Sequence, residues 1–178
     1  MTSDWELWDR ARRGSVTAWR ELVQHHHSRL VSLGLLITGS AAAAQDVAQE
    51  SFVRLLQLDP KHRQGSVGGL LSTIAYRLAL KERRRATRHT DLSGHDPPLA
   101  DPSVLDLLLR SERDRHIAAA IRSLDGDHRD TLVLRFYGGH SYQEIAELMG
   151  VPLGTVKSRM FYAVKQCREV LREKGILE

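Results

Sequence analysis

The sequence predicts an all-α protein with two small helical domains joined by a flexible linker, the second domain containing a helix-turn-helix. Apolar residues recur at helical spacing on both sides of the segment "TDLSGHDPPLADPS", whose Pro, Gly, Asp and Ser content disfavours helix. No stretch alternates apolar and polar residues as a half-buried strand does. A chain of 178 residues has room for two such domains.

The charge distribution supports this division. Residues 1–85 carry a net charge of +5, residues 86–111 carry −2 and residues 112–178 carry +1. The overall charge of +4 is weak evidence for a polyanionic partner, so local clusters carry more weight. We expect domains at residues 1–88 and 112–178, with the linker at 89–111.

Composition argues against several classes of protein. Apolar runs such as "LVSLGLLI" are far shorter than the roughly 20 residues that span a bilayer, so we expect no membrane insertion. The N-terminus lacks the pattern of a signal peptide, and the single cysteine, Cys167, suits a reducing cytoplasm. No nucleotide-binding or nucleophile motif occurs, so we expect no enzyme and no cofactor.

The stretch "AAAAQDVAQESFVRLLQL" predicts a helix with two distinct faces. Its core stripe consists of Ala44, Ala48, Phe52 and Leu55. The opposite face carries Asp46, Gln49, Val53 and Leu56, with Glu50 beside it. Apolar side chains among polar ones on an outer face are typical of a protein interface, although an ordinary surface is the alternative.

The stretch "LLSTIAYRLALKERRRATR" predicts a longer, basic helix. The pattern buries Leu71, Ile74, Ala75 and Leu78 and exposes Thr73, Tyr76, Arg77, Leu80, Arg83 and Arg84. Positive charge gathers toward its end at Lys81, Arg83, Arg84, Arg85 and Arg88. Cations beside an aromatic ring suit phosphates and stacked bases, and five of them exceed what the helix dipole alone favours.

The stretch "SYQEIAELMGVPLGTVKSRM" predicts two helices separated by a tight turn. Ser141 and Glu144 form a capping box that starts the first helix, and Gly150 ends it in the left-handed conformation. Pro152 suits the first position of the next helix, where no backbone donor is lost. This is the pattern of a helix-turn-helix.

The second of these helices has an apolar side and a side suited to DNA. The apolar side carries Val156, Met160, Ala163, Val164, Cys167 and Leu171. The opposite side carries Gly154, Ser158, Phe161 and Lys165, flanked by Thr155, Lys157, Arg159 and Tyr162. Glycine permits close backbone approach, Ser and Lys can bond phosphates or base edges, and Phe can touch a thymine methyl group. We therefore predict a recognition helix in the major groove, against the alternative of a solvated helical hairpin.

At these residues the sequence resembles the promoter-reading domain of RNA polymerase sigma factors of the extracytoplasmic-function (ECF) group. The resemblance runs from Leu124 to Leu171 and centres on "SYQEIAELMGVPLGTVKSR". One departure is "LDG" at residues 124–126, where a Pro often follows the Leu. The resemblance implies recognition of the −35 promoter element by Tyr142, Gln143, Lys157, Ser158, Phe161 and Tyr162, supported by Thr155 and Arg159; Lys165 belongs to the same face.

The first half resembles the other domain of the same family, which docks on polymerase and opens the −10 element. The family pattern D-x-x-Q-E-x-F is intact as Asp46, Gln49, Glu50 and Phe52, and implies docking of this helix on the clamp of the largest polymerase subunit, with Val53 and Leu56 on the same face. The implied −10 contacts are Lys61, His62, Arg63, Tyr76, Arg77, Arg83 and Arg84, with Gln64 in the same loop. Departures stand at Leu70, Arg77 and Lys81, where the family usually has Trp, Asn and Asp.

The resemblance implies a set of partners. These are core RNA polymerase, through its clamp and flap regions, promoter DNA in double- and single-stranded form, and an anti-sigma factor. We expect no metal, because adjacent helical residues such as His25, His26 and His27 point about 100° apart and cannot converge on one ion.

One alternative is a stand-alone helix-turn-helix regulator that never joins polymerase. This alternative gives no function to the outer face formed by Asp46 to Leu56 or to the basic helix.

Overall fold

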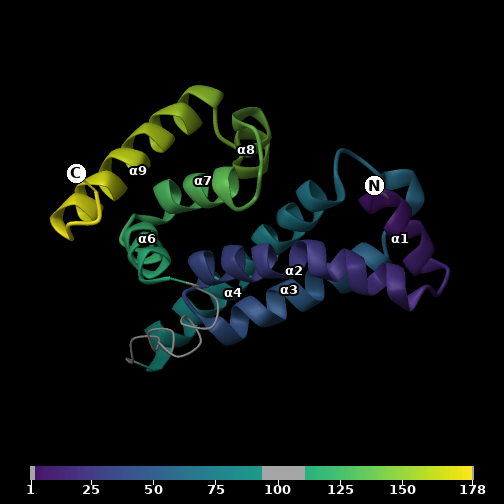
Figure 1. Cartoon of the computed structure of the whole chain (residues 1–178). Helices are drawn as coiled ribbons and strands as arrows, with labels where there is room; N and C mark the ends of the chain where they lie inside the picture. Colours follow the sequence, from purple (N-terminus) through teal and green to yellow (C-terminus); the bar gives the residue numbers. More distant parts are fainter. Residues whose placement is uncertain (1–2, 94–110, 178) are drawn as a thin grey trace.

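The computed structural model describes residues 3–93 and 111–177, which form helices and turns and contain no strand (Figure 1). The N-terminal domain consists of α1 (Asp4–Arg12), α2 (Val16–Thr38), α3 (Ala41–Leu56), the short 3-10 helix η1 (Pro60–His62) and α4 (Val67–Ser93). The C-terminal domain consists of α6 (Glu112–Arg122), α7 (Gly126–Phe136), α8 (Tyr142–Met149) and α9 (Leu153–Glu173). The prediction of an all-α fold with two helical domains is confirmed.

Only the two ends of the expected linker, residues 89–93 and 111, belong to the described part of the chain. Helix α4 continues through Ser93 and therefore runs into the segment that we assigned to the linker. The C-terminal domain resumes at Ser111, whose side chain accepts from the backbone N–H of Asp114 and caps α6. Residues 94–110 of the expected linker lie outside the described residues.

Helices α2, α3 and α4 pack side by side, and α1 lies across the end of this bundle (Figure 1). The predicted core stripe of α3 is confirmed, since all four of its residues are buried. The indole of Trp8 on α1 is fully buried, and its Nε1 donates to the carbonyl of Leu55 at 2.7 Å. This bond fixes α1 to the end of α3, next to the loop that leads to α4.

The C-terminal domain is built around α9, on which α6, α7 and α8 pack. The capping box of Ser141 and Glu144 is present as predicted, and Gly150 ends α8 with φ +67°. Pro152 occupies the N-cap position of α9, one residue earlier than predicted, and the helix begins at Leu153. The predicted apolar side of α9 faces the domain core, with Val164 and Cys167 only half-buried.

The two domains pack against each other, with α6 and α7 lying against α2 (Figure 1). Polar contacts also join α7 and the loop after it to α4. The carboxylate of Asp130 on α7 accepts two hydrogen bonds from the guanidinium of Arg83, at 2.8 and 2.9 Å, and one from the hydroxyl of Tyr76, at 3.1 Å. Buried apolar residues of both domains form one continuous cluster. The described chain is therefore a closed, two-domain unit.

A second set of contacts lies nearer the start of α4. The hydroxyl oxygen of Ser72 lies 3.0 Å from the carbonyl oxygen of Gly138 and 2.9 Å from Nε2 of His140. The guanidinium of Arg29 on α2 donates to the carbonyl of Tyr137. Both Ser72 and His140 are buried. The interface is thus held at separate points along α4 and α2.

This interface corrects the predicted faces of α4. Tyr76, which we expected to be exposed, is only 3% exposed, and Arg83 is half-buried. Ile74 and Leu78, which we expected in the core, are only half-buried. The helical pattern predicts only which residues of α4 face the N-terminal bundle. The C-terminal domain covers part of the opposite, polar face, and the pattern of α4 does not indicate this second contact.

Packing of α2 on α3 depends on Gly34. A Cβ atom at this position would lie 3.0 Å from the backbone Cα of Ala44, closer than side chains normally approach. We predict that Gly34→Ala lowers the free energy of unfolding by about 1–2 kcal/mol in urea denaturation, because overpacking outweighs the higher helix propensity of Ala. The matched variant Gly154→Ala lies within α9, and its Cβ would meet no atom within 4 Å, so stability should not fall and should rise slightly through the helix propensity of Ala.

The interface also predicts a pH dependence. Burial lowers the pKa of His140; the nearby Arg29 lowers it further, and Glu144 acts in the opposite direction. The unfolded chain therefore takes up this proton more readily, so stability should be greatest above the ordinary His pKa of about 6.5 and should fall as the pH drops through it. Urea denaturation at pH 7.5 and 5.5 should show this loss, and His140→Gln should reduce it. The exposed-site variant His62→Gln should leave the loss unchanged.

Candidate nucleic-acid and polymerase interfaces

The recognition helix α9 presents its predicted polar face to solvent. Lys157, Ser158 and Lys165 are exposed, and Phe161 and Tyr162 are exposed by 65% and 57%. The rings of Phe161 and Tyr162 meet edge to face with centroids 5.4 Å apart. Large aromatic side chains this exposed are unusual on an ordinary surface. The face therefore offers cations, a hydroxyl and aromatic rings to a ligand.

Other residues predicted near this face make contacts within the domain. The guanidinium of Arg159 pairs with Asp127 on α7, and its side chain is mostly buried. Arg135 lies over the half-buried ring of Tyr142, 5.5 Å from its centroid. Thr155 is half-buried, and its carbonyl accepts from the hydroxyl of Ser158 at 3.0 Å. The Arg159–Asp127 pair joins α9 to α7, and the contact of Arg135 with Tyr142 joins α7 to α8.

Gln143 lies on the exposed side of α8, where its amide donates to Glu147 at 3.1 Å. Its side chain is therefore accessible from solvent.

The loop before α4 is pinned to α1 by Arg63. Its guanidinium lies over the ring of Trp8, 4.5 Å from the centroid, and over that of Trp5 at 5.5 Å. It also pairs with Asp9. Lys61 and His62, on η1, remain exposed. Arg63 therefore holds the loop in place, while its two neighbours project from it.

The predicted strand-opening residues of α4 fall into two groups. Arg77 and Arg84 are exposed, whereas Tyr76 and Arg83 are held by Asp130. Burial and the adjacent carboxylate raise the pKa of Tyr76 well above its ordinary value. Hydrogen bonding to Asp130 likewise raises the pKa of Arg83. Both side chains keep their protons and act here as donors to one buried acceptor.

A polar cleft of about 510 Å³ lies between the start of α4 and helix α8. Thr73 and Arg77 line it from α4, and Glu144 and Glu147 line it from α8. The C-terminal domain thus places carboxylates across the cleft from a predicted −10 residue.

The outer face of α3 is open to solvent. Asp46 and Gln49 are exposed, and Val53 is exposed by 41%. Leu56 is half-buried, and Glu50 accepts from Arg54 at 2.8 Å. The closed arrangement of the two domains leaves this face uncovered.

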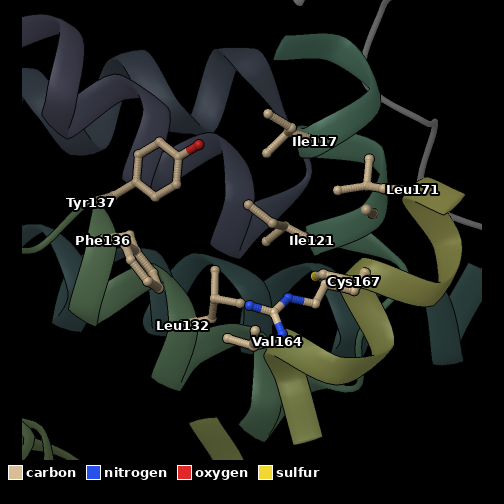
Figure 2. A pocket seen from close by; sticks show the side chains of 10 residues that line it. Ile117, Ile121, Leu132, Phe136, Tyr137, Val164, Cys167 and Leu171 are labelled. Atoms are coloured by element: carbon tan, nitrogen blue, oxygen red, sulfur yellow. The ribbon is translucent and has the colours of Figure 1, made fainter. Parts of the chain in front are cut away.

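An apolar groove in the C-terminal domain was not anticipated from the sequence. It has a volume of about 330 Å³ and lies between α6, α7 and α9 (Figure 2). Its lining includes Ile117, Phe136, Val164 and Cys167, and Phe136 is 62% exposed. Burial raises the pKa of the Cys167 thiol, which agrees with a packing role. The sequence feature that could have indicated this groove is Phe136, a large apolar residue at the end of α7.

Asp130 is the other residue that the sequence analysis missed. Its side chain is 3% exposed, and it belongs to the C-terminal domain while all its side-chain partners lie on α4. A local signal existed, because Val133 and Leu134, three and four residues later on the same helical face, are fully buried. An acidic residue on an apolar face indicates a buried partner, but the pattern cannot name it.

No cluster of three or more metal-binding side chains occurs within residues 3–93 and 111–177. His25 and His26 both bond the carboxylate of Asp4, at 3.0 and 2.8 Å. Across the described part of the chain, no helix is both long and apolar enough to cross a membrane.

Comparison with known proteins matches both halves of the chain to one family. Residues 22–89 match the family model for Sigma-70 region 2, and residues 120–169 match that for Sigma-70, region 4. The chain is 35% identical over 169 residues to the ECF RNA polymerase sigma factor SigL of Mycobacterium tuberculosis. This alignment covers 88% of the chain and 90% of SigL. It is 31% identical over 163 residues to SigE of Mycolicibacterium smegmatis, covering 89% of this chain and 63% of that relative.

Solved structures share the fold. CnrH in complex with the cytosolic domain of CnrY matches 97% of this chain and 99% of that chain, with a TM-score of 0.63 and 22% identity. The sigma factor RpoE from Bartonella quintana, in complex with the anti-sigma factor NepR, matches 88% and 98% with the same TM-score and identity. With a region 2 bundle, a region 4 helix-turn-helix and a relative aligned over nearly its full length, the chain belongs to the ECF family of RNA polymerase sigma factors.

Proposed function

We propose that this chain is a dissociable, non-catalytic subunit of RNA polymerase that selects promoters through their −10 and −35 elements. The observation that carries the proposal is the presence of two separate exposed faces on one chain. The outer face of α3 is suited to a protein, and the outer face of α9 is suited to DNA.

The −35 element is assigned to α9 and the start of α8. Lys157, Ser158 and Lys165 supply donors for phosphates and base edges, and Phe161 and Tyr162 supply apolar contact. Tyr142, Gln143, Thr155 and Arg159 support this surface. Arg159 acts through its ion pair with Asp127, which keeps α9 in register on α7.

The −10 element is assigned to η1 and α4. Lys61, His62, Arg77 and Arg84 are exposed and can meet the phosphates of an opening strand. Arg63 positions the loop through its contacts with Trp5, Trp8 and Asp9. Tyr76 and Arg83 belong to the same surface once Asp130 is withdrawn from them.

Polymerase docking is assigned to two surfaces. Asp46, Gln49, Glu50, Val53 and Leu56 on α3 would contact the clamp of the largest subunit. The apolar groove between α6, α7 and α9 would receive an amphipathic segment of the flap, and Arg168, which also lines it, could pair with an acidic residue there.

An anti-sigma factor is a further proposed partner. One structure with the same fold was solved together with an anti-sigma factor. Because core polymerase is the proposed partner, we also place the protein in the cytoplasm.

The alternative of a stand-alone regulator is not favoured. It accounts for α8 and α9 but not for region 2, the open face of α3 or the basic end of α4.

The function is tested by adding the purified protein to core polymerase on fragmented genomic DNA and sequencing the transcript starts. The proposal requires a shared motif upstream of starts that depend on this protein. Unchanged starts, together with tight binding of a palindromic site by the protein alone, would establish the stand-alone regulator instead.

Lys157→Ala should reduce transcription from a −35-dependent promoter about fivefold to tenfold, because one exposed groove contact worth about 1 kcal/mol is lost. Competition of the variant for core polymerase should be normal. The matched variant Lys174→Ala removes an exposed lysine just past the end of α9 and should leave transcription unchanged. Equal activity of the Lys157 variant would exclude this residue from promoter contact.

Asp46→Ala should weaken competition for core polymerase about tenfold, because it removes an exposed carboxylate from the proposed docking face. Binding of isolated −35 duplex DNA should not change. Glu173→Ala, which removes an exposed carboxylate from α9, is the charge control. Normal competition by the Asp46 variant would move the docking site elsewhere.

A further inference from the structure

We propose that Trp5 is a positioning residue for −10 recognition, because its indole holds the loop before α4 in the shape that meets an unpaired base. The loop comprises residues 59–66, between α3 and α4, and carries the exposed side chains of Lys61, His62 and Gln64. The inference rests on the proposed function of this loop. It adds a residue of α1, a helix that precedes the residues matched by the region 2 family model.

Trp5 contacts the loop at a residue with left-handed backbone. Its indole Nε1 donates to the carbonyl of Gly65 at 3.0 Å. Gly65 has φ +59°, a conformation that residues with a Cβ atom rarely adopt. The bond therefore ties α1 to the point where the loop turns toward α4.

A second tryptophan ties α1 to the other end of the loop. The Nε1 of Trp8 donates to the carbonyl of Leu55, near the end of α3. The rings of Trp5 and Trp8 meet edge to face with centroids 5.5 Å apart, and the guanidinium of Arg63 lies over both. The two indoles thus bridge the ends of the loop and support a side chain from its middle.

Helix α1 is itself held against α2, at the end of the bundle where the loop runs (Figure 1). The carboxylate of Asp4, next to Trp5, bonds the imidazoles of His25 and His26 on α2. Leu7, two residues after Trp5, is fully buried. Trp5 therefore projects from a helix that is anchored on both sides of it.

The loop and the polar face of α4 form one surface. Three loop residues and two residues of α4 line the polar cleft of about 510 Å³: Gln64, Gly65, Ser66, Thr73 and Arg77. Arg77 is exposed and belongs to the proposed −10 surface. A change in the loop therefore alters the surroundings of this arginine.

An ordered loop favours selectivity. A base that binds a preorganised loop does not have to offset the entropy of ordering it. Donors and acceptors at fixed places also distinguish one base edge from another, whereas a mobile loop adapts to several. Loss of the bond from Trp5 should therefore reduce the discrimination between bases at the −10 element.

Trp5→Phe is the test variant, because it keeps an aromatic ring beside Trp8 and Arg63 but removes the Nε1 donor. Trp19→Phe is the matched control. It makes the same change on α2, where the ring of Trp19 packs edge to face on Phe52.

Gly65→Ala disturbs the loop from its own side. The added Cβ would meet no atom within 4 Å, so the variant tests only the left-handed backbone. Gly175→Ala, at φ +67° and equally open, is its control beyond the end of α9. Gly65→Ala also replaces Trp5→Phe if circular dichroism shows that the latter does not fold.

Limited digestion of the free chain with trypsin reports the order of the loop without polymerase. Cleavage after Lys61, identified by mass spectrometry, requires the loop to open locally. Trp5→Phe should be cut there at least about threefold faster than the wild type or Trp19→Phe, because the loop has lost one of its ties to α1. Gly65→Ala should be cut faster than Gly175→Ala.

Promoters found by sequencing the transcript starts give the readout of selectivity. Each base of their shared −10 motif is replaced in turn, and transcription by polymerase carrying each variant is compared with that from the original promoter. Trp5→Phe should lower the preference for the original base at least about threefold at one or more −10 positions, with −35 preferences unchanged. A role in stability alone would lower transcription from all of these promoters by the same factor.

The proposal is overturned if the folded variants keep the wild-type rate of cleavage after Lys61, or if they keep the wild-type −10 preferences. Equal loss of preference at the −10 and −35 elements would overturn it as well. If the wild type directs no transcript starts, the proposed function fails instead, and the cleavage rates still show whether Trp5 holds the loop.

Discussion

One buried carboxylate, that of Asp130, joins the C-terminal helix α7 to the basic helix α4, within an interface that apolar packing and the contacts of Ser72 and Arg29 also hold. A buried ion pair adds little net stability compared with well-packed apolar residues, but loss of one partner costs about 3–5 kcal/mol because the other charge is left buried. The pair therefore specifies a geometry more than it adds stability.

The outer faces of α3, α9 and α4 differ in how far the packing of the two domains covers them. The α3 face and the α9 face point to solvent, so they are available to polymerase and duplex DNA in the closed state. Helix α7 covers Tyr76 and Arg83 on the polar face of α4, whereas Arg77 and Arg84 on the same helix stay exposed.

Local chemistry allowed much of this molecule to be predicted from its sequence. Ser141, Glu144 and Gly150 set the ends of α8 through interactions within a few residues, and the buried stripe of α3 follows from helical periodicity. The burial of Tyr76 could not be predicted, because its partner Asp130 is 54 residues away in the other domain. The contacts of Arg63 could not be predicted for the same reason, because its partners, two tryptophans and an aspartate, lie on α1. Periodicity assigns a face to a helix, but it does not say which partner covers that face.

The central claim is that the chain meets polymerase through the outer face of α3, apart from the face of α9 that we propose for DNA. Hydrogen exchange of the wild-type protein, alone and bound to core polymerase, tests it most directly. The account predicts that peptides of α3 around Asp46 and Gln49 gain protection on binding, because the proposed docking face becomes covered. Unchanged exchange in α3 would contradict it.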